Sequence, residues 1–122
     1  MKRSNKDIGS YCEELATQYL KNKNYNILDR NFRNHLGEID IICIKNNLLI
    51  ILEVKGRYNY SFGLPKESVN YAKQMSIINI TKSYINYKKL FNINIRFDII
   101  EVYLNSYNTL FKINHITDAF RL

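Results

Sequence analysis

The stretch GEIDIICIKNNLLIILEVKGR, residues 37–57, contains two apolar runs on either side of Asn46-Asn47. Asparagine tolerates the left-handed backbone conformation that tight hairpin turns require. The pattern therefore predicts a β-hairpin with strands at 38–45 and 48–55. The second strand opens with five successive apolar residues, LLIIL, which is typical of a strand that is covered on both faces of its sheet.

Apolar periodicity predicts four further elements around this hairpin. They are, in chain order, a helix at about 6–21, a strand at about 25–33, a helix that follows the suitable N-cap residue Asn70 and ends near 87, and a strand at 93–103. A short last strand at 110–116 is left open, and GRYNYSFGLP, residues 56–65, is expected to form a loop. The order α-β-β-β-α-β predicts an α/β fold with a mixed sheet flanked by helices.

Length and composition limit the class of protein. The chain has 122 residues and no Gly/Ser-rich linker or internal repeat, so we expect one domain over 1–122. Its apolar runs fall well short of the ~20 residues that cross a bilayer, and its polar, charged start is unlike a signal peptide. Cys12 and Cys43 lie in apolar patterns far apart in the sequence, and the two histidines give no zinc-type spacing. We therefore expect a cytoplasmic protein, with no membrane contact, whose two thiols are reduced and buried.

The net charge of +7 and the pI of about 9.4 favour a polyanionic partner. The chain is also rich in Asn, Ile, Lys and Tyr and poor in Ala, as an AT-rich coding sequence would produce in any protein. Charge alone therefore does not separate a nucleic-acid-binding protein from a protein of biased composition.

The hairpin register predicts a cluster of charges. If Lys45 faces Leu48 across the turn, facing residue numbers sum to 93, so Asp40 is expected to lie opposite Glu53. Facing residues point to the same side of a sheet, and Lys55, two positions after Glu53, shares that side. Two carboxylates and one ammonium group are thereby predicted to meet on one face of the sheet.

Facing carboxylates destabilise a hairpin unless one binds a proton or a cation neutralises both. Two carboxylates, together with waters and substrate oxygens, are the usual ligands of Mg²⁺. Lys55 would then stabilise charge on a phosphate or orient a water molecule for attack. The alternative is a chance spacing, with a surface ion pair between Glu53 and Lys55 that contributes little.

The first helix offers a third acid. Glu14 shares its row of the helix with polar residues and is expected to face solvent, whereas Glu13 shares its row with Gly9, Ala16 and Leu20. Small and apolar neighbours let a carboxylate lie close to the surface on which the helix packs. We therefore expect Glu13, and not Glu14, to join the site.

These residues carry a resemblance to a known family. RNFRNHLGEIDIICIKNNLLIILEVKGR, residues 30–57, resembles the core of the YraN-type family of small bacterial proteins, which are related to PD-(D/E)xK nucleases. The likeness continues through GSYCEELATQYLKNKNYNILDRNFR, FGLPKESVNYAKQMSIINI, RFDIIEV and INHITDAF, and so covers nearly the whole chain. It implies a single nuclease-like domain with a restriction-endonuclease-like fold, and archaeal Holliday-junction resolvases are among the nearer relatives.

The resemblance also implies roles for individual residues. The helix acid of the family falls on Glu13, its strand acid on Asp40, and its Glu-x-Lys on Glu53 and Lys55. Two basic positions of the family fall on Arg57 and Lys73. The chain departs from the family pattern at Cys12, where Gly is frequent, and at Gly56, where a bulkier residue is usual. We expect Gly56 to loosen the loop after Lys55.

Basic and aromatic residues flank this predicted site. Arg57, Lys66 and Lys73, interspersed with aromatic rings, are expected to contact nucleic acid, with cations at the phosphates and rings at unstacked bases. The alternative is an ordinary loop whose rings pack back onto the core. Arg30 and Arg33 are expected either to add phosphate contacts or to pair with nearby acids. Arg96 and Asp98 are interpreted as the polar side of a strand, paired with each other's neighbours, with contact to the site as the alternative. His115 is interpreted as a structural residue.

The sequence therefore leads to a preferred hypothesis and an alternative. The preferred one is a Mg²⁺-dependent, sequence-independent DNA endonuclease, with Mn²⁺ as a substitute metal and branched or distorted DNA among its candidate substrates. Asp40 and Glu53 would bind the metal, with the Val54 carbonyl as an extra ligand, and Glu13 would bind a metal-bound water or a second ion. The alternative is a non-catalytic nucleic-acid-binding or scaffold module. RNA is a less favoured substrate, and junction resolution would require a homodimer because it needs paired active sites.

Overall fold

The computed structural model describes residues 5–58, 69–105 and 110–121, which form two helices and five strands. In chain order they are α1 (Asn5–Asn22), β1 (Asn26–Asn34), β2 (Gly37–Lys45), β3 (Leu48–Tyr58), α2 (Tyr71–Lys88), β4 (Asn94–Leu104) and β5 (Phe111–Phe120). The predicted helices and strands are present, and the strand left open near the C-terminus is present as β5. β3 runs to Tyr58, past its predicted end at 55, so residues 56–58 are strand and not the expected loop. Residues 59–65 of that predicted loop lie outside the described residues. Within these segments neither helix is long and apolar enough to cross a membrane.

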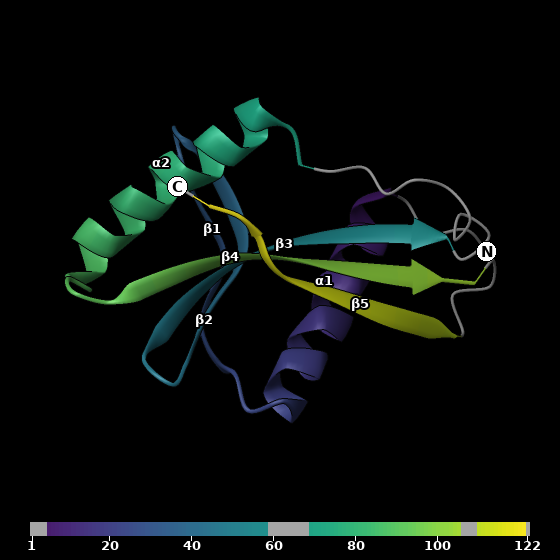
Figure 1. Ribbon diagram of the computed structural model, residues 1–122. Coiled ribbons are helices and arrows are strands. Elements are labelled where there is room, and N and C mark those ends of the chain that lie inside the picture. The colour runs from purple at the N-terminus through teal and green to yellow at the C-terminus, as the bar shows by residue number, and fades with distance from the viewer. Residues whose placement is uncertain (1–4, 59–68, 106–109, 122) are drawn as a thin grey trace.

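The five strands form one mixed sheet in the order β1-β2-β3-β4-β5. β3 and β4 are parallel, since α2 lies between them in the chain, and the other neighbours are antiparallel. The sheet lies between the two helices, with α2 above it and α1 below it in Figure 1. The predicted α/β architecture, with a mixed sheet flanked by helices, is confirmed.

The central hairpin has the predicted turn and register. Asn46 and Asn47 adopt left-handed conformations, with φ of 52° and 62°, as a two-residue turn between twisted strands requires. The strands pair from Lys45↔Leu48 to Ile41↔Leu52, and each pair sums to 93 as expected.

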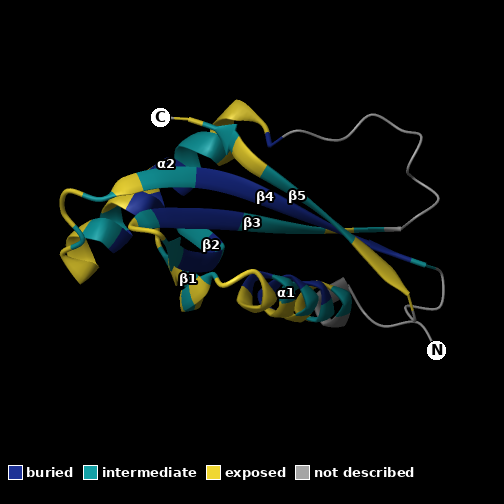
Figure 2. Ribbon diagram, turned by 60° about the horizontal axis from the view of Figure 1, so that its bottom comes forward, coloured by how far each residue is buried: buried dark blue, intermediate teal, exposed yellow. Residues whose placement is uncertain are grey.

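The apolar run of β3 supplies side chains to two separate cores. Leu49 and Ile51 pack in the cluster under α2, whereas Ile50 and Leu52 pack in the cluster on α1. Figure 2 shows the buried residues concentrated in β3 and β4, with exposed residues toward the sheet edges. A strand buried on both faces needs consecutive apolar residues, which explains LLIIL.

The start of α2 is fixed by its N-cap. The Asn70 side chain accepts a hydrogen bond of 2.8 Å from the backbone N–H of Lys73, which satisfies one of the unpaired donors of the first turn. The helix ends at Lys88, and the left-handed backbone of the following Lys89 (φ 56°) lets its N–H bond back to Asn86. These two caps fix where α2 begins and ends.

Gly56 differs from its sequence-based expectation. It lies within β3, paired with Val102, and not in a loop. A Cβ atom at this position would lie 2.8 Å from the Cys12 Sγ of α1, which is closer than packed atoms approach. Both cysteines are free and buried, as predicted. The two departures from the family pattern, Cys12 and Gly56, therefore touch each other, and the glycine makes room for the thiol.

Candidate active site

Asp40 lies at an irregularity in the middle of the sheet. The pairing of β2 with β3 ends at Ile41↔Leu52, one position before the expected Asp40–Glu53 pair. Pairing of β2 with β1 also omits Asp40, together with Asn31, which has a left-handed backbone with φ of 55°. The hairpin arithmetic thus placed Asp40 beside β3 but did not predict that the ladder stops there.

The backbone irregularity turns the Asp40 side chain toward β3. Ile39 and Ile42 both pack in the cluster under α2, although strict alternation would put them on opposite faces. The Asp40 Oδ2 instead accepts a hydrogen bond of 2.8 Å from the Val54 N–H. This bond replaces the next rung of the ladder and holds the carboxylate beside Glu53.

Glu53 is a mostly buried carboxylate, with 13% of its side chain exposed. Burial, and secondly the neighbouring Asp40 carboxylate, raise the pKa of Glu53 to about 7, against the lowering effects of Lys73 and Lys55. The Lys73 Nζ lies 3.7 Å from the Glu53 Oε1. Glu53 therefore lies among one like charge and two opposite charges.

The pKa of Asp40 depends on the same two lysines. Burial raises its pKa, the Val54 N–H hydrogen bond opposes that rise, and Lys73 and Lys55 also act to lower it. The structure thus brings Asp40, Glu53 and Lys55 together, as the sequence indicated. It adds Lys73 of α2, whose charge acts on both carboxylates.

Glu13 reaches the edge of this cluster from α1. Its pKa is raised, first by burial and then by the Asp40 carboxylate, and is lowered by a hydrogen bond from the Asn31 side chain. Glu14 points away, is exposed, and binds Gln18 and Arg30. The helix therefore presents Glu13 to the cluster and Glu14 to solvent, as its pattern predicted.

The carboxylates of this cluster are candidate ligands for a metal ion. Among the side chains that the structure describes, no three of His, Cys, Asp or Glu lie together as they do around a bound metal ion. The Asp40–Glu53 pair still suits Mg²⁺, which binds through one or two carboxylates and retains several waters. Its oxygen donors are partly buried, and their mutual repulsion would be relieved by a divalent cation.

The predicted nucleic-acid contacts differ in their surroundings. Lys73 is at the carboxylates, and Lys66 lies outside the described residues. Arg30 binds Glu14 at 3.0 Å and Arg33 binds Glu38 at 3.1 Å, so for these two the alternative of pairing with acids is present in the structure.

Arg57 is held by a residue that the sequence analysis did not single out. Its Nε donates to the Glu101 Oε2 at 3.0 Å, and the Glu101 side chain is buried. The Asn114 side chain donates to the other carboxylate oxygen at 2.8 Å. Glu101 interrupts the apolar run IIEV much as Glu53 interrupts IILEV, so the same signal could have found it. Glu101 of β4 is paired in register with Lys55 of β3, and it fixes Arg57 two residues further along β3.

Asn31 is a second residue that the sequence analysis missed. It adopts the left-handed conformation opposite Asp40, and its side chain bonds to Glu13. Asparagine is common in that conformation, but the strand pattern gave no sign that this position would differ from its neighbours. Asn31 therefore links the β1 irregularity to the helix acid.

Arg96, Asp98 and His115 form a separate buried network. Arg96 binds both oxygens of Asp98 at 2.8 Å, and the His115 Nε2 lies 2.8 Å from the Asp98 Oδ2. The His115 Nδ1 lies 3.1 Å from the Tyr19 hydroxyl of α1. Arg96 and Asp98 therefore bind each other, as well as other residues, and the contacts of His115 agree with a structural role.

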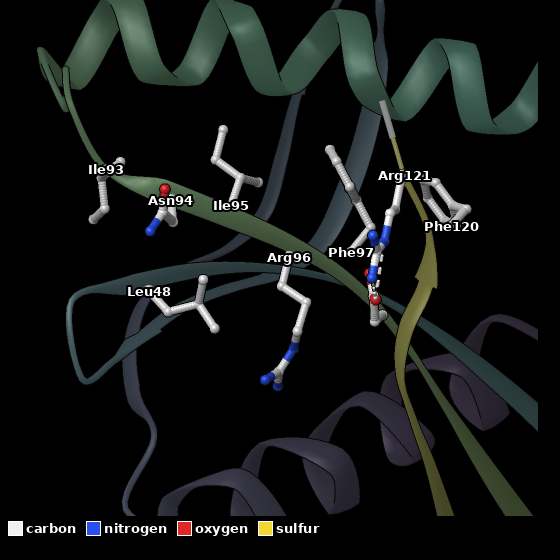
Figure 3. A pocket seen from close by; sticks show the side chains of 9 residues that line it. Leu48, Ile93, Asn94, Ile95, Arg96, Phe97, Phe120 and Arg121 are labelled. Atoms are coloured by element: carbon white, nitrogen blue, oxygen red, sulfur yellow. Dashed lines mark hydrogen bonds and ion pairs between the residues drawn. The ribbon is translucent and has the colours of Figure 1, made fainter.

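A pocket of about 630 Å³ opens at the beginning of β3, where Leu48 lies. It is lined by Leu48 and by residues that include Arg96 and Arg121 (Figure 3). Both of these arginines already bind carboxylates, Arg96 that of Asp98 and Arg121 that of Asp118. The pocket therefore does not share the charge arrangement of the Asp40–Glu53 cluster.

The mixed five-stranded sheet, the two flanking helices and their order along the chain define an α/β protein with a restriction-endonuclease-like fold. Comparison with known sequences then identifies the family. The chain belongs to the YraN-type family, described as "Uncharacterised protein family UPF0102", whose model matches residues 12–102. This match spans Glu13, Asp40, Glu53 and Lys55, together with Lys73.

Curated relatives agree over nearly the full chain. It is 69% identical over 121 residues to a UPF0102 protein of Clostridium botulinum strain Eklund 17B, with 99% of each chain covered. It is 68% identical to a UPF0102 protein of Clostridium beijerinckii, over 100% of this chain and 99% of the other. A UPF0102 protein of Clostridium perfringens strain ATCC 13124 is 48% identical over the whole of both chains.

Proposed function

We propose that this protein is a metal-dependent endonuclease that hydrolyses phosphodiester bonds in DNA. The observation that carries the proposal is the pair of partly buried carboxylates, Asp40 and Glu53, beside the two ammonium groups of Lys55 and Lys73. Carboxylates bind a hard cation and ammonium groups bind phosphate oxygens. A site for a metal-bound phosphate needs both kinds of group.

Each residue then has a role. Asp40 and Glu53 would hold Mg²⁺, or Mn²⁺ in its place, with the Val54 carbonyl as a further ligand. The Val54 N–H keeps the Asp40 carboxylate directed at this position. Glu13 would hold a water molecule, and Lys55 would offset charge at the phosphorus centre or orient the attacking water. A bound divalent ion supplies charge neutralisation at the phosphate and lowers the pKa of a coordinated water.

The surrounding cations suit a nucleic-acid backbone. Lys73 lies at the carboxylates and is 45% exposed, so it can contact solvent and a substrate at once. Arg30 and Arg33 reach solvent while they pair with acids, and phosphate contact would require exchange of those partners. With a net charge of +7, binding to the backbone is expected without base readout. Branched or distorted DNA is the proposed substrate, RNA a less favoured one, and a homodimer would supply the paired sites that a junction requires.

One observation favours the second candidate, a non-catalytic nucleic-acid-binding or scaffold module. Lys73 already forms an ion pair with Glu53, so the cluster is partly neutralised without a metal. A protein that has lost catalysis would keep this pair and its basic surface. DNA binding would then persist without metal and would survive substitution of Asp40.

Cleavage assays separate the two candidates. Labelled four-way junction, flap, duplex and single-stranded DNA, with a matching RNA, would be incubated with Mg²⁺, Mn²⁺ or EDTA. The wild type would be compared with Asp40→Asn and Lys55→Met, and with Lys82→Met as a matched control on the exposed part of α2. The nuclease proposal expects metal-dependent cutting that is lost in the first two variants and kept in the control. Binding of DNA in EDTA without cutting by any of these proteins would support the non-catalytic module instead.

A further inference from the structure

We propose that Lys73 is a built-in competitor of the metal ion: its ammonium group occupies Glu53 in the metal-free protein and is displaced when the cation binds. This inference rests on the proposed metal site at Asp40 and Glu53. It assigns Lys73 a role in setting metal affinity, beyond the nucleic-acid contact expected for this residue.

The first support is that Lys73 is unfavourably placed for its own helix. The amide groups of a helix N-terminus carry partial positive charge, so acidic residues are favoured and cations are disfavoured in the first turn. The first turn of α2 contains no acidic residue, and Lys73, whose N–H bonds to the Asn70 cap, is its third residue. Helix stability therefore does not explain a lysine at this position, whereas the carboxylates below it do.

The second support is the contact itself. The Lys73 Nζ lies 3.7 Å from the Glu53 Oε1, the oxygen that faces α2. A metal ion on that oxygen would lie within a few ångströms of the ammonium group, and two cations at such separation repel each other. The metal ion and the ammonium group therefore cannot both bind the Glu53 Oε1 without repelling each other.

The third support is that the Lys73 side chain can move away from Glu53. Its side chain is 45% exposed, against 13% for Glu53, so the lysine can swing into solvent while the carboxylate stays in place. Long lysine side chains exchange positions at small cost because the ammonium group remains hydrated. The displaced ammonium group would remain on the first turn of α2, beside the position of a metal-bound phosphate, and would be available to that phosphate.

The net charge of the cluster is consistent with replacement of the Lys73 ammonium group by a divalent cation. Glu13, Asp40 and Glu53 can contribute three negative charges, and Lys55 and Lys73 contribute two positive ones. Replacement of one ammonium by a divalent ion adds a single positive charge and neutralises the cluster. Lys55 of β3 also acts on both carboxylates, and its charge is counted in both states.

Metal binding in the absence of DNA tests this inference. Mn²⁺ affinity would be measured by calorimetry and by electron paramagnetic resonance for the wild type, Lys73→Met, Lys73→Gln, Asp40→Asn and the matched control Lys82→Met. Loss of the competing charge is expected to tighten Mn²⁺ binding about tenfold in both Lys73 variants, and Lys82→Met is expected to stay within about twofold of the wild type. Thermal melts would verify that all five proteins fold.

The outcomes separate this inference from the proposed function. Equal or weaker Mn²⁺ binding by folded Lys73→Met and Lys73→Gln, with binding by the wild type, would overturn competition and leave the metal site intact. Wild-type protein that binds no Mn²⁺, or that binds it equally well as Asp40→Asn, would overturn the metal site and the competition together.

Discussion

At the scale of the residue, Glu53 shows how strongly the surroundings of an ionisable group change its pKa. Its carboxylate is mostly buried and next to Asp40, and its pKa is about 7 in the folded protein, against 4.5 for the group in water. The unfolded chain therefore loses this proton at a lower pH than the folded protein does. As pH rises from about 4.5 to 7, the folded state is penalised increasingly, and above 7 the penalty is complete.

Glu53→Gln is therefore expected to stabilise the metal-free protein at pH 8 by roughly 1 to 3 kcal/mol, since the buried charge is removed. At pH 4.5, where Glu53 keeps its proton, the variant and the wild type should have similar stabilities. Urea unfolding in EDTA at both pH values measures the difference. A variant that is less stable than the wild type at pH 8 would show that Glu53 gains more from Lys73 than it loses to burial.

The contact of Cys12 with Gly56 gives a second prediction at this scale. Gly56→Ala should destabilise the protein by about 1 to 3 kcal/mol, because the new Cβ would overlap the Cys12 thiol. Cys12→Ala leaves space for that atom, so the double variant should lose less stability than the two single variants added together. A double-mutant cycle by urea unfolding measures this coupling. Additive losses would mean that the cost of Gly56→Ala does not arise from its contact with Cys12.

At the scale of the element, the central hairpin shows where sequence reasoning succeeded and where it stopped. The Asn-Asn turn and five residue pairs followed from local chemistry and the period of two, and the structure confirms them. These local rules did not predict that the strand pairing ends before Asp40. A pattern of alternating side chains assumes a uniform ladder, whereas this irregularity depends on β1, on the Val54 N–H and on Asn31, which are remote in the sequence.

The left-handed backbone at Asn31 can be tested by two substitutions that differ in how readily they adopt this conformation. Asn31→Gly removes the bond to Glu13 and keeps the left-handed backbone accessible, whereas Asn31→Ala removes both. The alanine variant should be less stable than the glycine variant by about 1 kcal/mol, because a Cβ without a local hydrogen bond disfavours φ near 55°. Chemical denaturation of both variants measures this gap. If alanine proves as stable as glycine, the left-handed conformation at Asn31 carries no strain in the folded protein.

At the scale of the whole molecule, the Asp98 network connects segments that are far apart in the chain. Asp98 of β4 bonds to Arg96, to His115 of β5 and to the Asp118 N–H, and His115 contacts Tyr19 of α1. Burial raises the pKa of Asp98, but the hydrogen bonds from His115, Arg96 and Asp118 outweigh it and hold the pKa below its ordinary value of 3.8. The ionised form is therefore the one that stabilises the fold.

Asp98→Asn should reduce the free energy of unfolding by about 3 kcal/mol at pH 7, because a buried charge pair loses one partner. A lowered pKa gives stability that is present above the unfolded value and is lost as pH falls through the folded value. The difference between variant and wild type should therefore shrink below pH 4. Thermal melts from pH 3 to 7 measure it, and a difference that does not change over this range would contradict the role of the ionised carboxylate.

Long-range pairing also explains what the sequence could not predict about the site. Glu13, Asp40, Glu53 and Lys55 were found because each sits in a local pattern, a helical row or a strand. Lys73 was assigned to nucleic acid, and its ion pair with Glu53 depends on how α2 lies across the sheet. The burial of Arg57 against Glu101 depends on the parallel pairing of β3 with β4, which brings together residues 44 positions apart in sequence.

The proposed metal site can be tested by a crystal structure of the protein grown with Mn²⁺, in which the ion is located by its anomalous scattering. We expect a peak bound by carboxylate oxygens of Asp40 and Glu53, with the Lys73 ammonium group moved away from the Glu53 Oε1. A map without a peak between these carboxylates, and with the Lys73–Glu53 ion pair intact at saturating Mn²⁺, would contradict it.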